Sequence, residues 1–231
     1  MQIQNMFEGE IVDLDDPQKL GRVKVRETLT HSNRVDDEDL FWSHVLMPPT
    51  SANAKGIGTS PLGLSKGSKV LGIKINSKQS YVIGSIAYAE DDNNHSVSKH
   101  ARGIGPVDKT YIKELGEKET KYAAKYPYNK TITTESGHVL ELDDTPQAER
   151  IHIYHKSGAY VEIFPDGSII TKSMKDSVSV TMNDHSISVV KGDLQIVANE
   201  GKIQINSDGD IDLVSKSGVV NVRGVKIGLN G

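Results

Sequence analysis

The feature that most constrains this fold is a repeat in residues 140–227, where short strand-like triplets place apolar residues on either side of one polar residue. Alternation with a period of two predicts strands with one buried apolar face and one wet polar face. A unit this short cannot bury its own apolar face, so neighbouring units must stack into a solenoid or prism. The triplets are Leu140–Leu142, Ile151–Ile153, Val161–Ile163, Val178–Val180, Ile187–Val189, Leu194–Ile196, Ile203–Ile205, Ile211–Leu213, Val220–Val222 and Val225–Ile227.

Glycines recur at short intervals near the end of the repeat, for example at Gly192, Gly201 and Gly209. Glycine supplies backbone angles that a side chain would obstruct at a tight corner. The sequence ends at Gly231 without a globular cap, and an uncapped stack of strands exposes edges that promote aggregation. We therefore expect another protein to cap the stack, or identical chains to close around it.

Composition excludes several classes of protein. Aromatic residues make up only 5% of the 231 residues, which argues against a large aromatic core, and no apolar run is long enough to span a membrane. The absence of cysteine excludes disulfides and thiolate metal sites, and the N-terminus lacks the pattern of a signal peptide. The net charge is −4 with no evident basic face, which argues against nucleic-acid binding.

Three segments differ in pattern. Residues 1–88 contain strand candidates separated by turn residues, and this number of short strands predicts a small closed barrel. Residues 89–128 break the pattern and predict an extended linker with at most a short helix within 111–125. Residues 129–231 carry the repeat. The expected barrel strands cover residues 7–13, 20–26, 41–47, 69–75 and 80–86.

The candidate ligands for a metal do not form a convincing site. His152 and His155 are three residues apart, so in a strand their imidazoles point to opposite faces and are expected to be structural surface residues. The aspartates at 143–144 and 208–212 lack the spacing of a calcium loop and are interpreted as turn and surface residues. The sequence predicts no metal and no cofactor.

Catalysis is not indicated either. Glycoside hydrolysis requires two carboxylates that flank a substrate cleft. Glu141, Glu162 and Asp212 alternate with apolar residues, so we expect them on the wet face of their strands, where nothing marks one as buried. Neither a phosphate-binding loop nor a Ser-His-Asp arrangement is present, and the prediction is that the protein is not an enzyme.

Two parts of the chain resemble one known family. Residues 126–146, with the stretch Gly137-His-Val-Leu-Glu-Leu-Asp-Asp-Thr145, and residues 149–158 and 163–167 are similar to the start of the triple-stranded β-helix of phage central spike proteins. Residues 9–17 and 21–26 resemble the oligonucleotide/oligosaccharide-binding (OB) barrel of that family. The family includes the T-even baseplate spike and the valine-glycine-repeat spikes of type VI secretion.

The resemblance implies an all-β chain with an N-terminal OB-fold barrel, a linker and a C-terminal intertwined trimeric β-helix or prism. It further implies a homotrimer whose barrels dock on a trimeric hub protein. This trimer would be assembled in the host cytoplasm and reside in the virion tail baseplate, or belong to a phage-derived injection system. It would puncture the host outer membrane when the sheath contracts. Expected structural positions are Gly9, Gly21 and Arg22 in the barrel and Gly137, His138, Glu141 and Asp143 where the needle starts.

Two departures from the family pattern shape this expectation. The T-even spike carries a muramidase domain between barrel and β-helix, whereas residues 89–128 are too few for such a domain. Some short phage spikes end in a His-x-His iron site, but residues 224–231 contain no such ligands. We therefore expect a separate tip protein of the proline-alanine-alanine-arginine (PAAR) type at the C-terminal apex.

Two alternatives from other classes remain open. One is a carbohydrate-binding or carbohydrate-cleaving β-helix of the tailspike kind, which would need an acid cluster in a groove and more aromatic residues. The other is nucleic-acid binding through the barrel, because Arg22, Lys24 and Arg26 alternate on one strand face.

Overall fold

The structure, a computed structural model of the chain, describes residues 6–31, 35–58, 63–91, 95–104 and 122–228. The chain divides into two units, Met1–Ser177 and Val178–Gly231. Within the described ranges the one helical element is a short 3-10 turn, η1 (Asp37–Asp39), and every other regular element is a strand. None of the described residues belong to a helix that is long and apolar enough to cross a membrane. The predicted all-β class is confirmed.

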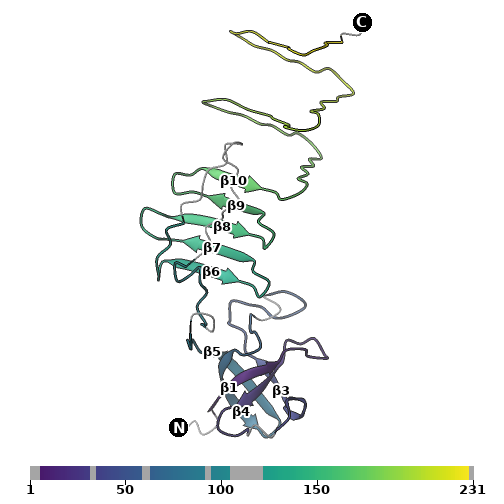
Figure 1. Cartoon of the computed structure of the whole chain (residues 1–231). Coiled ribbons are helices and arrows are strands. Elements are labelled where there is room, and N and C mark those ends of the chain that lie inside the picture. Colours follow the sequence, from purple (N-terminus) through teal and green to yellow (C-terminus); the bar gives the residue numbers. More distant parts are fainter. Residues whose placement is uncertain (1–5, 32–34, 59–62, 92–94, 105–121, 229–231) are drawn as a thin grey trace. The chain divides into compact units, whose positions relative to one another are not determined.

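The first five strands form a closed barrel in the order β1-β2-β3-β5-β4 (Figure 1). Strands β3 and β5 pair in parallel and all other neighbours are antiparallel, which is the arrangement of a five-stranded OB barrel. The barrel predicted from the sequence is therefore confirmed. Its strands are β1 (Met6–Asp13), β2 (Val23–Glu27), β3 (Trp42–Val45), β4 (Lys69–Asn76) and β5 (Gln79–Ser85).

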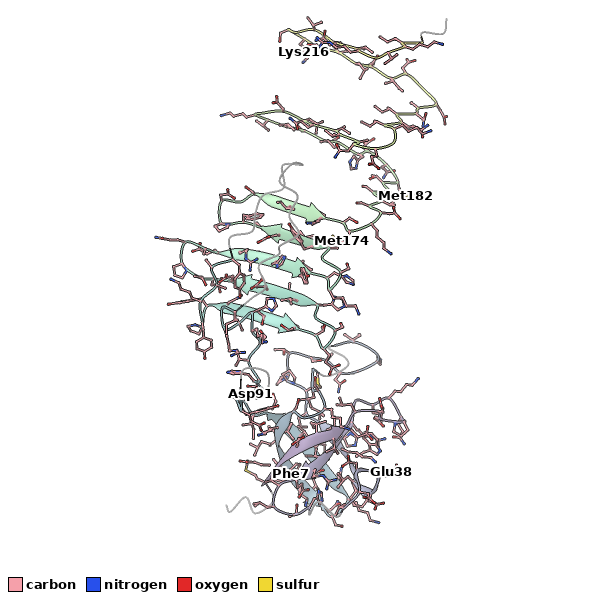
Figure 2. The ribbon with its side chains drawn as sticks, viewed as in Figure 1. Phe7, Glu38, Asp91, Met174, Met182 and Lys216 are labelled. Carbon is pink, nitrogen blue, oxygen red and sulfur yellow. The ribbon has the colours of Figure 1, made fainter. Side chains whose placement is uncertain are left out.

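A small aliphatic core closes the barrel from within. Its fully or nearly fully buried members are Ile11, Val23, Val25, Val70 and Val82. Phe7, labelled in Figure 2, packs against them. These are β-branched residues, whose side chains pack well on a pleated surface. The residues of one chain are therefore sufficient to bury the barrel core.

A second sheet follows as a simple meander in the order β10-β9-β8-β7-β6, with every neighbouring pair antiparallel (Figure 1). Three of its four connections are the same tight turn, with glycine at the fourth residue, Gly137, Gly158 or Gly167, at positive φ. The strands are β6 (Asn129–Thr133), β7 (Val139–Asp143), β8 (Arg150–Tyr154), β9 (Tyr160–Ile163) and β10 (Ile169–Lys172).

Residues 178–228 contain no strand, and every side chain described there is exposed. Met182, for example, is 92% exposed, and Figure 2 shows it and Lys216 standing out from backbone that has no neighbouring strand within its own unit. The triplets from Val178 onward therefore find no partner strand inside one chain, and the β-helix predicted for them stays a prediction.

The linker is described only in part. The short helix considered for 111–125 falls largely outside the described residues, and residues 122–125 are not helical. Strand β5 ends at Ser85 and β6 begins at Asn129. The domain boundaries 1–88, 89–128 and 129–231 remain predictions.

Candidate functional site

The two faces of the sheet β6–β10 are exposed in the opposite sense to that expected for a soluble sheet. The apolar residues of the triplets are exposed, including Leu140 at 38%, Ile151 at 42% and Ile153 at 54%. The polar residues between them are buried, with Glu141 at 0% and Glu162 at 1%. The prediction that Glu141 and Glu162 lie on a wet face is wrong, whereas Asp212 is exposed as expected.

The apolar face is continuous across the strands. Cross-strand pairing places Leu140 opposite Ile153 and Leu142 opposite Ile151, so these side chains share one face. A shallow groove of about 490 Å³ runs along it and is lined in part by Ile132, Leu140, Ile153 and Val161. An exposed apolar surface of this kind marks an interaction site in a soluble protein.

On the opposite face, two carboxylates and a guanidinium form a buried ionic cluster, defined here as Glu141, Arg150 and Glu162. Arg150 Nη2 donates to Glu141 Oε2 at 2.7 Å, and Nη1 donates to Glu162 Oε1 at 2.8 Å. The Arg150 side chain is only 4% exposed. Charged side chains are rarely this buried unless they are paired, and here one arginine bridges strands β7, β8 and β9.

Two further polar side chains contact the Glu141 carboxylate. Asn129 Nδ2 donates to Glu141 Oε1 at 2.5 Å, and His152 Nδ1 lies 3.4 Å from Glu141 Oε2. Burial by itself raises the pKa of Glu141, but the hydrogen bonds from His152 and Asn129 and the charge of Arg150 outweigh it, so the net pKa lies below its usual value. Glu141 is therefore held ionised at neutral pH.

A segment that precedes β6, called the strap (residues 98–104 and 122–125), covers this polar face. The main-chain carbonyl of His100 accepts from the Tyr122 hydroxyl at 2.7 Å and from Asn129 Nδ2 at 3.0 Å. The Arg150 guanidinium lies 5.0 Å from the centre of the Tyr122 ring. Burial, followed by the nearby charge of Glu141, raises the pKa of Tyr122 to about 12, and burial lowers the pKa of His100.

The expected needle residues lie in and beside this cluster. Glu141 belongs to it, and Asp143 is 2% exposed and accepts a hydrogen bond from the Thr145 N–H at 3.0 Å. Gly137, at φ 92°, and His138 form the turn between β6 and β7. Asp143 was expected in a turn or on the surface, and its burial corrects the surface part of that expectation.

The expected barrel residues lie in two places, the contact between β1 and β2 and the segment just before β2. Gly9 lies where β1 meets β2, and an added Cβ would fall 2.6 Å from the Arg26 carbonyl oxygen. Gly21, at φ 74°, precedes β2. Arg22 is paired with the buried Asp16 through Nη2 at 2.6 Å and Nε at 3.1 Å, and these bonds, the largest influence, hold the pKa of Asp16 well below its usual range.

Sequence reasoning missed Arg150, Asn129 and Asp16. Arg150 and Asn129 begin their strands, where polar residues are common, and Asp16 lies in a predicted turn. One available signal was that Arg150 shares the two-residue period with His152 and the polar residues of the triplets, which places them on the same face.

The considered metal pair does not form. His152 contacts Glu141, whereas His155 contacts the His138 ring, with ring centres 4.4 Å apart and the planes tilted by 42°. Among the residues that the structure describes, no group of three or more potential metal-binding side chains is present. His152 was expected at the surface, but its side chain is only 14% exposed.

The buried carboxylates also differ from a glycosidase pair. Glu141 and Glu162 are both bound by Arg150, which occupies the space between them where a substrate would have to lie. Both are closed to solvent in this chain. The arrangement is suited to holding strands β7, β8 and β9 together through ion pairs rather than to acid–base chemistry on a sugar.

The basic face of β2 is occupied by the chain's own acceptors. Lys24 Nζ donates to the carbonyl oxygens of Asp37 and Glu38 at 3.0 and 2.9 Å. Arg26 pairs with the Asp37 carboxylate at 2.5 Å, and Arg22 pairs with Asp16. These contacts weaken the nucleic-acid alternative, because phosphates would have to displace them.

Comparisons with known proteins point in one direction. The profile of a family described as the Gp5 N-terminal OB domain matches residues 25–148. Protein Gp5 of Vibrio phage KVP40 is 30% identical over 252 aligned positions, which cover 78% of this chain and 60% of the relative. The pre-baseplate central spike protein Gp5 of Enterobacteria phage T4 is 34% identical over 108 positions, covering 47% of this chain and 19% of the relative. The chain thus spans less than two thirds of the length of either relative.

Proposed function

The chain belongs to the Gp5 N-terminal OB domain family, and from this membership we propose that it is a structural component of the central spike in a contractile-tail baseplate. The T4 relative carries this role in its name. In this proposal the protein resides in the virion tail after assembly in the host cytoplasm, and it has no catalytic function of its own.

The observation that carries the proposal is the exposed apolar face of the sheet β6–β10 together with the unpaired repeat that follows. Ile132, Ile153 and Ile169 are each more than half exposed, and so are most large apolar residues in 178–228. An isolated chain would leave backbone polar groups without hydrogen-bond partners and apolar side chains in water, and both are energetically unfavourable. Other strands must therefore pair with this region.

We propose that the partners are two further copies of the same chain, wound into a three-stranded β-helix. Three equivalent chains would pair every strand edge and bury the triplet residues in a shared core, in line with the closed symmetry of most homo-oligomers. A core of this kind would form a rigid needle. This shape fits the further proposal that the needle crosses the host outer membrane during sheath contraction.

The remaining partners are proposed for the two ends of the needle. The barrel would dock on a trimeric hub protein, and a PAAR-type tip protein would cover the C-terminal apex. Gly9, Gly21 and Arg22 would preserve the barrel, while Gly137, His138, Glu141 and Asp143 would shape the first turn and strand of the needle. A purified protein that binds neither class of partner would contradict this part of the proposal.

The test is the native mass of the full chain by light scattering, followed by gels of unboiled and boiled samples in SDS. We expect a mass about three times the chain mass of 25.2 kDa and a band that resists SDS until boiling, because dissociation requires three wound chains to separate. A monomer that remains soluble would contradict the wound trimer and, with it, the spike role.

A further inference from the structure

The hydrophobic pattern of β7 and β8 does not determine how these two strands are aligned. In the observed register Leu140 faces Ile153 and Leu142 faces Ile151. A shift of β8 by two residues keeps every side chain on its own face, because the side-chain period of a strand is two. Leu142 would then face Ile153, and apolar residues would still face apolar residues.

A glycine turn sets the register at three of the four connections in this sheet, and the connection between β7 and β8 has a different geometry. In the other three connections the N–H of the first residue donates to the carbonyl of the fifth, and the glycine N–H donates back to the carbonyl of the first. Such a turn fixes which residues face each other. Residues 144–149, between β7 and β8, form a longer loop without glycine. It contains a turn in which the Ala148 N–H donates to the Thr145 carbonyl at 2.9 Å, but this turn is joined to the strands through Asp144 and Glu149 and does not pair the strand ends directly.

The buried ionic cluster lies across the β7–β8 pair, whose connection lacks the glycine turn. Glu141 lies directly opposite His152 and diagonally opposite Arg150. If Leu142 moved opposite Ile153, Arg150 would face Thr145 and move away from Glu141, and His152 would face Asp143. The buried carboxylate would lose its ion pair with Arg150 and its contact with His152, which is far more costly than any change on the apolar face.

A shift in the other direction is resisted less strongly. It would bring Leu140 opposite Ile151 and place Arg150 directly opposite Glu141, where an ion pair can still form. It would also take His152 away from Glu141. The cluster therefore discriminates mainly against the shift that pairs Leu142 with Ile153.

We propose that the Glu141–Arg150–Glu162 cluster is the element that sets the register between β7 and β8, and so the alignment of the first strands of the repeat. The role concerns pairing inside one chain and does not rest on the proposed spike function. Buried polar groups that select one alignment among similar apolar ones are known from coiled coils.

Because the chain contains no cysteine, disulfide trapping can test this proposal in the full chain. One pair, Leu140→Cys with Ile153→Cys, reports the observed register, and a second pair, Leu142→Cys with Ile153→Cys, reports the shifted one. Directly opposed residues lie within disulfide reach, whereas diagonal ones are too far apart. Denaturing gels without reductant separate cross-links within a chain from those between chains.

With the natural cluster we expect only the first pair to cross-link within the chain. In the combined variant Glu141→Gln, Arg150→Met and Glu162→Gln, which removes all three charges together, we expect cross-linking of the second pair to rise roughly tenfold or more. Lys130→Ala, which removes an exposed ion pair with Asp144 on the same sheet, is the matched control and should leave both yields unchanged.

A combined variant that keeps the cross-linking pattern of the natural protein would overturn the proposal. If that variant does not fold, Glu141→Gln alone decides the question. It removes the ion pair between β7 and β8 and keeps Arg150–Glu162 between β8 and β9. Cross-linking of the pair Leu142→Cys and Ile153→Cys, which reports the shifted register, should then increase. No increase would refute the proposed role of the cluster.

Discussion

In the barrel, Ile11, Val70 and Val82 are completely buried by their own chain, whereas in the sheet β6–β10 Leu140, Ile151 and Ile153 face outward and the charged residues are buried. Both regions are built from strands with a two-residue period. The barrel closes on itself, so its apolar face needs no partner. The open sheet cannot close, so its apolar face is available to other chains. The comparison teaches that the same strand pattern leaves an apolar face either buried within the chain or exposed on it, depending on whether the sheet closes.

The largest effect is expected where the two regions differ most. Ile153→Asp places a charge on the exposed apolar face of β8 and should abolish assembly, because a buried carboxylate without a partner is highly unfavourable. Light scattering should then report the mass of one chain.

The control for this variant is Leu29→Asp, which makes the same kind of change at a leucine that is 97% exposed beside the barrel. It should leave the native mass unchanged. Loss of assembly in the control, or its retention in Ile153→Asp, would contradict the contrast between the regions.

The next largest effect concerns the buried cluster. Arg150→Met leaves Glu141 and Glu162 buried without their shared cation and should destabilise the sheet by about 3–5 kcal/mol. Hydrogen exchange of amides in β7–β9 should accelerate accordingly, while amides of the barrel strands keep their protection. An equal acceleration in the barrel would mean that the two regions unfold together.

The barrel can be tested separately through its core. Ile11→Ala removes a fully buried side chain and should lower the free energy of unfolding of the barrel by about 2–5 kcal/mol. Trp42, the single tryptophan, lies in β3 and reports this transition by fluorescence. The native mass should not change in folded protein. A variant that folds but no longer assembles would show that assembly depends on the barrel.

A smaller and pH-dependent effect is expected at Asp16. Its pKa is lowered in the folded protein, chiefly by the hydrogen bonds from Arg22, so the ionised form stabilises the barrel above the unfolded pKa and this contribution is lost as the pH falls below about 4. The midpoint of barrel unfolding, followed by Trp42 fluorescence, should therefore fall as the pH is lowered. Asp16→Asn should lower the midpoint at pH 7 and reduce this dependence on pH. An unchanged pH profile in that variant would contradict the assignment.

The smallest effect is expected at the exposed pair of Lys130 and Asp144. Lys130→Ala should change the free energy of unfolding by about 1 kcal/mol or less, because both side chains are more than half exposed. Thermal melting in low and high salt measures this. A loss comparable to that in Arg150→Met would show that burial does not explain the difference between the two ion pairs.

The sequence predicted the barrel well because local signals agree with the final packing there. The residues around Ile11, Val70 and Val82 alternate cleanly and end at turn residues, so each strand could be placed to within a few residues of its ends. Strand β2 begins at Val23, later than expected, because Asp16 accepts hydrogen bonds from the N–H groups of Gln18 and Leu20 and keeps that stretch in a turn.

The candidate site was less predictable, because periodicity identifies two faces but not which one is buried by the chain itself. Glu141 and Glu162 were placed on the wet face on the general rule that carboxylates are solvated. Arg150 and the strap at His100 and Tyr122 reverse this outcome, and these contacts join residues distant in the sequence. Such long-range compensation is not visible in local patterning.

The repeated glycine turn has an evolutionary consequence. Gly137, Gly158 and Gly167 close the same short loop, and Gly192 and Gly201 carry the same left-handed φ further along the chain. Because each turn depends on its own few residues, an apolar triplet with its neighbouring glycine can be duplicated or deleted in 178–228 without disturbing a core built within the chain. Length in this region is therefore a trait that lineages can adjust in whole units, and relatives are expected to differ there by multiples of one triplet with its glycine.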